Sequence, residues 1–310
     1  MKFINNTNFA KGVAYTIISA IVFGFTPILA KITYNGGSNE VTLTFLRSLF
    51  SIPFLYIGII KCKESLRITK MELLHLAVLS ILGISLTTTM LYASYNYISV
   101  GMATTIHFIY PMMVYSICVI FYKEKIILKK VLAIIFSMVG IIMLIDNLMA
   151  GSIIGVVLAA FSGVTYGLFM IYLDKSGLKN MNPFKSTIYI NLFNVLWLFL
   201  WGTFTDKLTF SLTPLTFELT IIIAFLTSIL GNALLQLGVK YCGASTASIL
   251  CTFEPITSVI LGIIFLNESL TILKIIGCCF ILLAVVLLSN KQKTTPKQFL
   301  RFPKLSRRIT

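Results

Sequence analysis

The chain has 310 residues, of which 57% are hydrophobic and 11% are charged, and its formal net charge is +15. A soluble domain carries about 25% charged residues, so this chain lacks the polar residues that would cover a water-exposed surface. The composition therefore excludes an ordinary soluble protein and predicts that a lipid bilayer surrounds most of the chain. The basic residues lie between apolar runs and in the C-terminal tail, so we expect no nucleic-acid partner.

A helix needs about 20 apolar residues to cross the ~30 Å hydrocarbon core of a bilayer. Ten runs of roughly this length follow one another along the chain, near residues 12–33, 41–60, 72–92, 97–121, 130–146, 152–172, 184–204, 217–237, 243–265 and 271–289. Lipid leaves no water for free backbone groups, and the runs are too uniformly apolar for barrel strands. We therefore expect an all-α membrane protein of ten transmembrane helices.

The connections between the runs are short, and their charges predict an orientation. With both termini in the cytoplasm, 21 of the 25 Lys and Arg residues lie on the cytoplasmic side and 3 on the other side. Positive loops favour the cytoplasmic side. We expect a multi-pass protein of the cell (plasma) membrane with both termini cytoplasmic. Its basic tail, residues 291–310, is expected to lie near anionic lipid headgroups.

The chain also contains an internal repeat, which a shift of 144 residues reveals by aligning residues 91–144 with 235–288 without a gap. Residue types that are rare in membrane helices match between the two copies: Pro111 with Pro255, Glu124 with Glu268, and Lys130 with Lys274. Each half then has five spans, and an odd number places the two halves in opposite orientations. Inverted repeats of this kind build many secondary transporters, with the substrate site near the membrane midplane.

Two runs in these copies, GMATTIHFIYPMMVYSICVIFYKEKI and GASTASILCTFEPITSVILGIIFLNESL, share small residues, a proline within the helix and a terminal glutamate. They resemble the paired signatures of the drug/metabolite transporter superfamily, EamA type, and the early segment AIVFGFTPILAK resembles the first half of that family. The resemblance implies two inverted five-helix repeats around a central cavity, which we place at residues 1–146 and 150–290. It implies transport of a small metabolite without specifying which one.

Charged groups within the membrane are costly, so they need a partner or a polar cavity. Glu254 lies halfway along the ninth run, and Pro255 after it frees the carbonyl group of Cys251 from helix hydrogen bonding. Two interpretations remain open for Glu254. It lines the substrate site, or it is a structural carboxyl group held between helices.

His107, Tyr110 and Pro111 share one face of the fourth run. The shift of 144 residues matches Tyr110 with Glu254, so pseudo-symmetry predicts that these two side chains approach each other from opposite halves. His107 is a candidate cavity-lining residue and a candidate proton carrier, because histidine titrates near neutral pH. The alternative is a neutral histidine bonded to a neighbouring hydroxyl group.

Other polar side chains on the spans complete the candidate substrate site: Thr88, Tyr92, Asn191, Asn232 and Gln236. About half of such groups are expected to hold helices together rather than bind substrate. For Arg47, in the second run, we expect packing or a pair with Glu40 or another acidic group.

The prediction that follows is a monomeric secondary transporter that moves a small-molecule substrate, such as an amino acid or a nucleobase, by alternating access. Export is favoured over uptake by family analogy, and proton coupling is left open. An intramembrane lipid-modifying enzyme and a membrane sensor subunit are the alternatives. We expect no enzymatic activity and no cofactor or metal, since the sequence has neither a nucleotide-binding GxxxxGK[ST] motif nor metal-ligand spacing.

Overall fold

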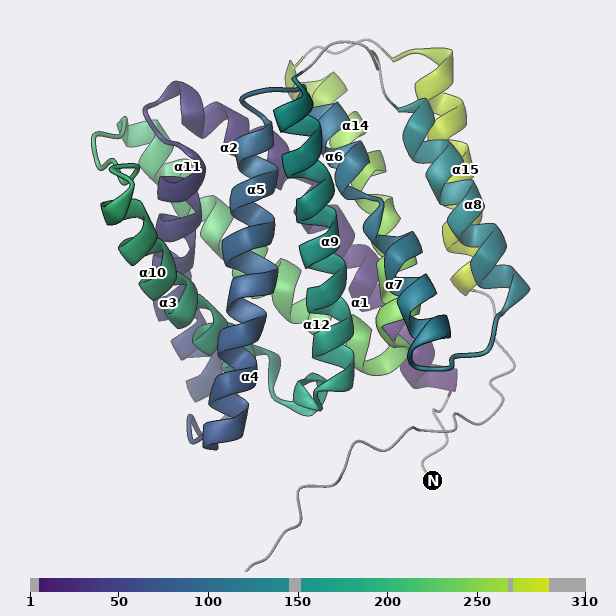
Figure 1. Cartoon of the computed structure of the whole chain (residues 1–310), viewed down its shortest axis with the longest axis horizontal. Helices are drawn as coiled ribbons and strands as arrows, with labels where there is room; N and C mark the ends of the chain where they lie inside the picture. The colour runs from purple at the N-terminus through teal and green to yellow at the C-terminus, as the bar shows by residue number, and fades with distance from the viewer. Residues whose placement is uncertain (1–5, 145–151, 267–269, 290–310) are drawn as a thin grey trace, which may run out of the picture.

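The structure is a computed structural model, and it describes residues 6–144, 152–266 and 270–289. These residues form helices and no strand, as the composition predicts. The helices run roughly parallel and antiparallel to one another in a single bundle (Figure 1).

The first half of the chain contains α1 (Asn6–Gly24), α2 (Thr26–Asn35), α3 (Glu40–Lys61), α4 (Lys70–Ser80), the π-helix η1 (Ile81–Leu86), α5 (Thr87–Ser94), α6 (Val100–His107), α7 (Tyr110–Ile120) and α8 (Leu128–Met143). The second half contains α9 (Ile153–Lys175), the 3-10 helix η2 (Leu178–Asn180), α10 (Pro183–Phe204), α11 (Pro214–Ala224), the π-helix η3 (Phe225–Gly231), α12 (Asn232–Cys242), α13 (Ala244–Leu250), the 3-10 helix η4 (Cys251–Phe253), α14 (Glu254–Leu266) and α15 (Ile272–Ser289).

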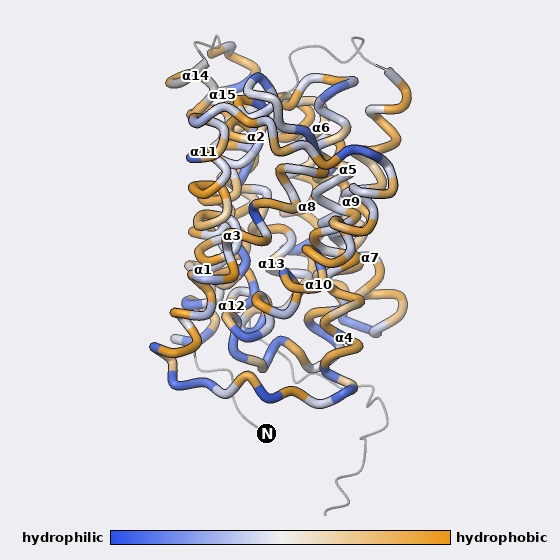
Figure 2. Tube along the Cα trace, turned by 90° about the vertical axis from the view of Figure 1, so that its left-hand side faces the viewer, coloured by the Kyte–Doolittle hydropathy of each residue, from blue (hydrophilic) through white to orange (hydrophobic). Residues whose placement is uncertain are grey.

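Several of these elements continue one another as single transmembrane helices. Nine helical runs in the described part of the chain are long and apolar enough to cross a membrane. The helix α8, with 16 residues, is shorter and provides the remaining predicted span next to α15. Hydrophobic residues cover most of the length of the bundle, and hydrophilic residues gather at its two ends (Figure 2). The chain is thus a multi-pass membrane protein.

Most described Lys and Arg residues lie at one end of the bundle, which we call the basic end; it is the lower end in Figure 1. The basic end carries the start of α1 and the connections 62–69, 121–127 and 176–182. The connections 36–39, 95–99 and 205–213 lie at the opposite end. This separation of charge is the one that the loop charges predict.

Side-chain caps begin the helices at both ends. Each of these caps accepts a hydrogen bond from a backbone N–H group in the first turn that the helix leaves free: Asn39, Thr69, Ser99, Ser152, Asn182 and Thr213. At α4 the cap is a full capping box, because the Glu72 side chain also accepts from the Thr69 backbone. In contrast, α13 begins without a side-chain cap. Gly243 is the one residue between α12 and α13, and its φ of 80° favours glycine.

The two halves share their helical irregularities as well as their sequence pattern. The π-helix η1 begins at Ile81 and η3 begins at Phe225, which is a shift of 144 residues. The break between α6 and α7 follows His107, and η4 begins at Cys251, which again differs by 144. The repeat therefore extends to the backbone geometry.

The helices α8 and α15 run side by side in opposite directions at one edge of the bundle (Figure 1). Phe136 lies opposite its own repeat equivalent, Phe280, with 5.9 Å between the ring centroids. Nearby the two backbones touch, because a Cβ atom added to Gly140 would lie 2.6 Å from the carbonyl oxygen of Gly277. Small residues allow such close approach in membranes. A pseudo-two-fold axis therefore passes through this helix pair.

Candidate substrate site

Two broken helices meet in the middle of the bundle. The proline in each copy lacks an N–H group and clashes with the carbonyl group four residues earlier, so the helix ends just before it. The first break is at Phe108, whose N–H group is shared between the carbonyl oxygens of Thr104 and Thr105 at 3.0 and 3.2 Å. The second break is the 3-10 turn η4 before Glu254. Irregular backbone at this depth is typical of transporter substrate sites.

Glycines in the neighbouring helices let other backbones approach these breaks. A Cβ atom on Gly163 of α9 would lie 2.5 Å from the carbonyl oxygen of His107. A Cβ atom on Gly24 of α1 would lie 3.0 Å from the carbonyl oxygen of Glu254 and 2.5 Å from the Thr257 side chain. The broken helix of each half is therefore contacted closely by the first span of the other half.

Glu254 lies in the first turn of α14 and is partly exposed within the bundle. Its carboxyl group interacts electrostatically with tyrosines from three other spans: Tyr92 and Tyr95 of the third, Tyr110 of the fourth and Tyr166 of the sixth. The structure thus brings Tyr110 and Glu254 together, as the shift of 144 residues predicts. Phenol rings beside a carboxyl group suit a cation or an amino group.

His107 is buried against this tyrosine cluster. Its ring centroid lies 5.3 Å from that of Tyr110 and 5.4 Å from that of Tyr166. Its Nδ1 atom lies 2.9 Å from the hydroxyl group of Ser162, which itself donates to the carbonyl oxygen of Ala159 at 2.6 Å. Because the hydroxyl proton is used there, Nδ1 of His107 is the donor to Ser162. The geometry matches the alternative of a histidine that is bonded to a hydroxyl group.

Arg47 is 6% exposed and lies near the same cluster. Its guanidinium group donates to the hydroxyl groups of Thr88 at 2.9 Å and Tyr92 at 3.2 Å. Of the alternatives expected for Arg47, burial by packing is observed and the pair with Glu40 is not, because Glu40 accepts from Lys207 at 2.8 Å. Glu40 and Arg47 are seven residues apart, about 10 Å along the helix, whereas the connection 205–213 brings Lys207 directly to Glu40.

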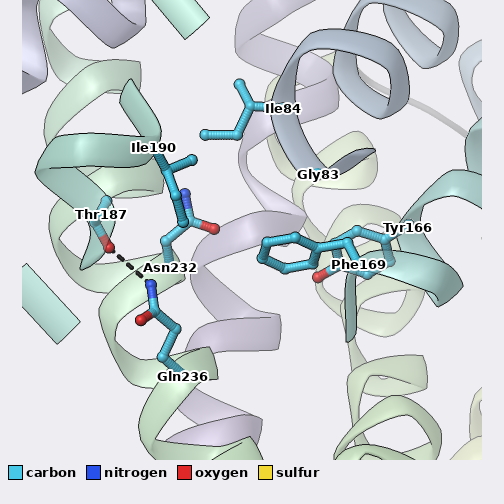
Figure 3. A pocket seen from close by; sticks show the side chains of 8 residues that line it. All are labelled: Gly83, Ile84, Tyr166, Phe169, Thr187, Ile190, Asn232 and Gln236. Atoms are coloured by element: carbon cyan, nitrogen blue, oxygen red, sulfur yellow. Dashed lines mark hydrogen bonds between the residues drawn. The ribbon is translucent and has the colours of Figure 1, made fainter. Parts of the chain in front are cut away.

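A small cavity adjoins the cluster on the side of the basic end, with about 20 Å³ available to the centre of a water molecule. Asn232 and Gln236 from α12 face Tyr166 and Phe169 from α9 across it (Figure 3). This volume suits one or two water molecules. Because Tyr166 lines the cavity and also interacts with Glu254, the cavity and the tyrosine cluster form one polar region.

The remaining predicted residues serve contacts between helices. Gln236 donates to Thr187 at 2.8 Å and accepts from Ser186, so both ends of its amide are held by α10. Asn191 is fully buried and donates to Ser51 at 2.7 Å, which ties α10 to α3. Asn232 lines the cavity together with Gln236 but, unlike Gln236, is only partly buried.

Sequence reasoning missed two tyrosines that interact electrostatically with Glu254, namely Tyr95 and Tyr166. A signal existed for one of them, since Tyr95 follows Tyr92 by three residues and shares its helix face. Among the described residues, no group of three or more His, Cys, Asp or Glu side chains is placed to hold a metal ion.

Comparison with known proteins agrees with this architecture. The chain is 23% identical to the uncharacterized transporter sll1319 of Synechocystis sp., over 96% of this chain and 98% of that protein. It is 24% identical to an uncharacterized transporter of Archaeoglobus fulgidus, over 89% of this chain and 95% of the relative. The uncharacterized transporter YyaM of Bacillus subtilis is 26% identical, over 69% and 72% of the two chains.

One solved crystal structure has the same fold, with a TM-score of 0.71 over 89% of this chain and 95% of the other. The sequence identity to that protein is 13%, so the likeness concerns the fold alone. The repeat, the broken helices and these relatives lead to one assignment. The chain belongs to the EamA-like transporter family, whose sequence model matches residues 10–146 and again residues 153–290.

Proposed function

We propose that the chain is a secondary transporter that moves a small metabolite, such as an amino acid or a nucleobase, out of the cytoplasm by alternating access. In this proposal the basic end faces the cytoplasm, the protein lies in the cell membrane and a single chain is the working unit. The single observation that carries the proposal is the position of Glu254. It lies at a broken helix, and it interacts electrostatically with Tyr110 at the break of the other half and with Tyr166, which lines a polar cavity.

The inverted repeat supports alternating access. Two halves with matching irregularities can exchange roles, so that states open to either side lie close in free energy. Polar groups at mid-membrane are costly unless they serve a pathway. Glu254 is also the candidate for proton coupling, because a carboxyl group that faces the substrate region can exchange a proton for the substrate.

The proposal is tested by efflux from proteoliposomes that contain the purified full-length protein and are loaded with amino acids and nucleobases. Wild-type protein is expected to release at least one loaded solute faster than protein-free liposomes. Glu254→Gln is expected to lower that rate about 10- to 100-fold, the loss of one charge-assisted contact. Glu218→Gln is the matched control, because Glu218 is exposed on α11 outside the site.

If none of the loaded solutes leaves the liposomes faster than from protein-free liposomes, the proposed transport is contradicted. Equal rates for the wild type and Glu254→Gln contradict the role of Glu254 alone. An imposed pH gradient that accelerates wild-type efflux, but not that of Glu254→Gln, assigns the proton coupling to this residue.

A further inference from the structure

The connection between α7 and α8 presents apolar side chains outward at the level of the lipid headgroups, and we call residues 121–129 the α7–α8 surface. The preceding span, Val100–Ile120, has 21 residues and fills the ~30 Å hydrocarbon core, so the residues after it lie at the membrane boundary. Phe121, Ile126 and Leu128 are between 69% and 72% exposed. Such large apolar groups are unfavourable in water and stable where headgroups meet acyl chains.

Three lysines alternate with the apolar residues on this surface. They are exposed, and no ion pair of theirs is found within the described residues: Lys123, Lys125 and Lys129. The flexible side chain of a lysine carries its ammonium group from apolar surroundings to the phosphate groups of lipids. In contrast, Lys130, the next residue, is buried and lies 3.7 Å from Glu124. The surface therefore combines three unpaired positive charges with three outward apolar groups.

The backbone of the α7–α8 surface is held in place from inside the bundle. The N–H group of Ile127 donates to the hydroxyl group of Tyr115 at 2.9 Å. The N–H group of Glu124 donates to the carbonyl oxygen of Cys118 at 3.0 Å, and the Glu124 carboxylate lies 3.1 Å from Lys175. A surface that is already ordered loses little conformational entropy when it binds a ligand.

The connection 62–69, at the same end, is built differently. Its apolar residues Leu66 and Ile68 are partly buried and pack against the bundle. The carbonyl oxygen of Leu66 accepts from the hydroxyl group of Tyr189 at 2.6 Å, which holds the connection against α10. This connection also carries exposed basic residues, but its apolar residues face the protein. The combination of outward apolar groups with lysines thus distinguishes the α7–α8 surface from its neighbour.

The internal repeat shows that the helix–connection–helix arrangement does not require these lysines. A shift of 144 residues matches the α7–α8 surface with residues 265–273 of the inverted second half. The apolar residues keep their type in that copy: Phe265, Leu270 and Ile272. The lysines have no basic counterparts there: Asn267, Ser269 and Leu273. The three positive charges are therefore particular to the first copy, which ends its fourth span at the basic end.

We propose that the α7–α8 surface binds anionic phospholipids of the leaflet at the basic end. The apolar side chains insert at the upper part of the acyl chains, and the lysines contact the phosphate groups and the negative headgroups. Each lysine near such headgroups raises the affinity about fivefold. A zwitterionic phospholipid has no net negative charge and gains little from the lysines. The inference is independent of the proposed substrate and of the direction of transport.

The test is a lipid titration of the purified full-length protein in detergent, measured by native mass spectrometry. Phosphatidylglycerol and phosphatidylcholine with identical acyl chains are compared. Wild-type protein is expected to bind phosphatidylglycerol about 30-fold more tightly than phosphatidylcholine. In the combined variant Lys123→Gln, Lys125→Gln, Lys129→Gln this preference is expected to fall to about threefold or less, because glutamine is polar but carries no charge.

The matched control is the combined variant Lys61→Gln, Lys63→Gln, Lys70→Gln. It removes the same charge from exposed positions in and beside the connection 62–69, at the same end of the bundle. It is expected to keep a preference of at least about tenfold. If the triple variant of the α7–α8 surface does not fold, Lys125→Gln alone decides, and it is expected to lower the preference about fivefold.

Inorganic phosphate in excess is expected to leave phosphatidylglycerol bound, because phosphate lacks the acyl chains that contact the apolar residues. Displacement of the lipid by phosphate shows an ordinary anion site and overturns the inference. Equal affinity of wild-type protein for the two lipids overturns it as well, and is the result expected if the lysines serve only to orient the chain during membrane insertion. An equal loss of preference in the two triple variants also overturns it.

Discussion

The two ends of the bundle are closed by different electrostatics. At the basic end, Glu124 in the connection 121–127 lies 3.1 Å from Lys175 and 3.7 Å from Lys130, and it accepts a hydrogen bond from Ser245 at 2.7 Å. Lys175 also lies 3.1 Å from Asp174. These side chains are at most 20% exposed, and they come from α8, α9 and α13 as well as the connection, so they join the two halves.

At the opposite end, an exposed ion pair among the described residues connects the halves. Glu40 at the start of α3 accepts from Lys207 in the connection 205–213 at 2.8 Å, and the Lys207 side chain is 53% exposed. Solvent weakens such a pair to about 0–1 kcal/mol, whereas removing one partner of a buried network costs several times more. The difference teaches that the Glu40–Lys207 pair stabilises its end less than the Glu124 network stabilises the basic end.

The largest expected effect comes from removing the central charge of the basic end. Glu124→Gln leaves Lys130 and Lys175 facing each other without their shared carboxylate, at a cost of about 2 kcal/mol after a discount for partial exposure. The buried Cys118 thiol, which interacts electrostatically with Glu124, is then expected to react about 30-fold faster with a membrane-permeant maleimide. Site-resolved mass spectrometry measures this rate.

The matched control for that experiment is Glu64→Gln at the same end. Glu64 is 39% exposed and lies 3.8 Å from Lys185, so its loss is expected to change the Cys118 rate less than about threefold. Equal rates for the two variants would remove the basis for distinguishing the ends.

Low pH is expected to destabilise the basic end as well, at a smaller free-energy cost than the Glu124→Gln substitution. Burial opposes ionisation of Glu124, but Lys130, Ser245 and Lys175 outweigh it and lower the pKa of Glu124 below its ordinary value of 4.5. A carboxyl group with a lowered pKa stabilises the closed end above pH 4.5, and this stabilisation is lost as the pH falls through the lowered pKa. The melting temperatures of wild type and Glu124→Gln should therefore converge below pH 4.5. A constant difference there contradicts the role of Glu124.

The smallest effect is expected at the opposite end. Lys207→Gln removes the exposed pair with Glu40, and amide hydrogen exchange in the segment 205–213 should accelerate by less than about fivefold. Lys207→Arg keeps the pair and should exchange at the wild-type rate. If Lys207→Gln loosens its end more than Glu124→Gln loosens the basic end, the comparison is reversed.

The sequence predicts the spans and the repeat because rare residues carry both. Charges and prolines are so costly in a membrane helix that Pro111 and Pro255 stand out at a fixed spacing. The π-helices η1 and η3 have no such signal. They lie where Gly83 contacts Phe169 and where Gly231 contacts Phe23, and those contacts exist only in the assembled bundle.

Only part of the candidate site is predictable from the sequence. The spacing of the repeats alone matches Tyr110 with Glu254, so their approach is visible in the sequence. The partner of Arg47 was not predictable, since the 205–213 connection takes up Glu40 and thereby leaves Arg47 to hydroxyl groups. Long-range competition between basic residues for one carboxylate is not visible in a local pattern. The proposed roles of the site residues remain predictions.

The contact between α8 and α15 has an evolutionary consequence. Phe136 meets Phe280, its own counterpart, so the surface that each half presents there is complementary to itself. Two separate copies of one ancestral half, inserted in opposite directions, can make this isologous contact without any joining segment. Gene duplication and fusion then turn such a homodimer into one polypeptide. After fusion the copies are free to diverge, and in this chain Tyr110 and Glu254 occupy equivalent places in the two halves.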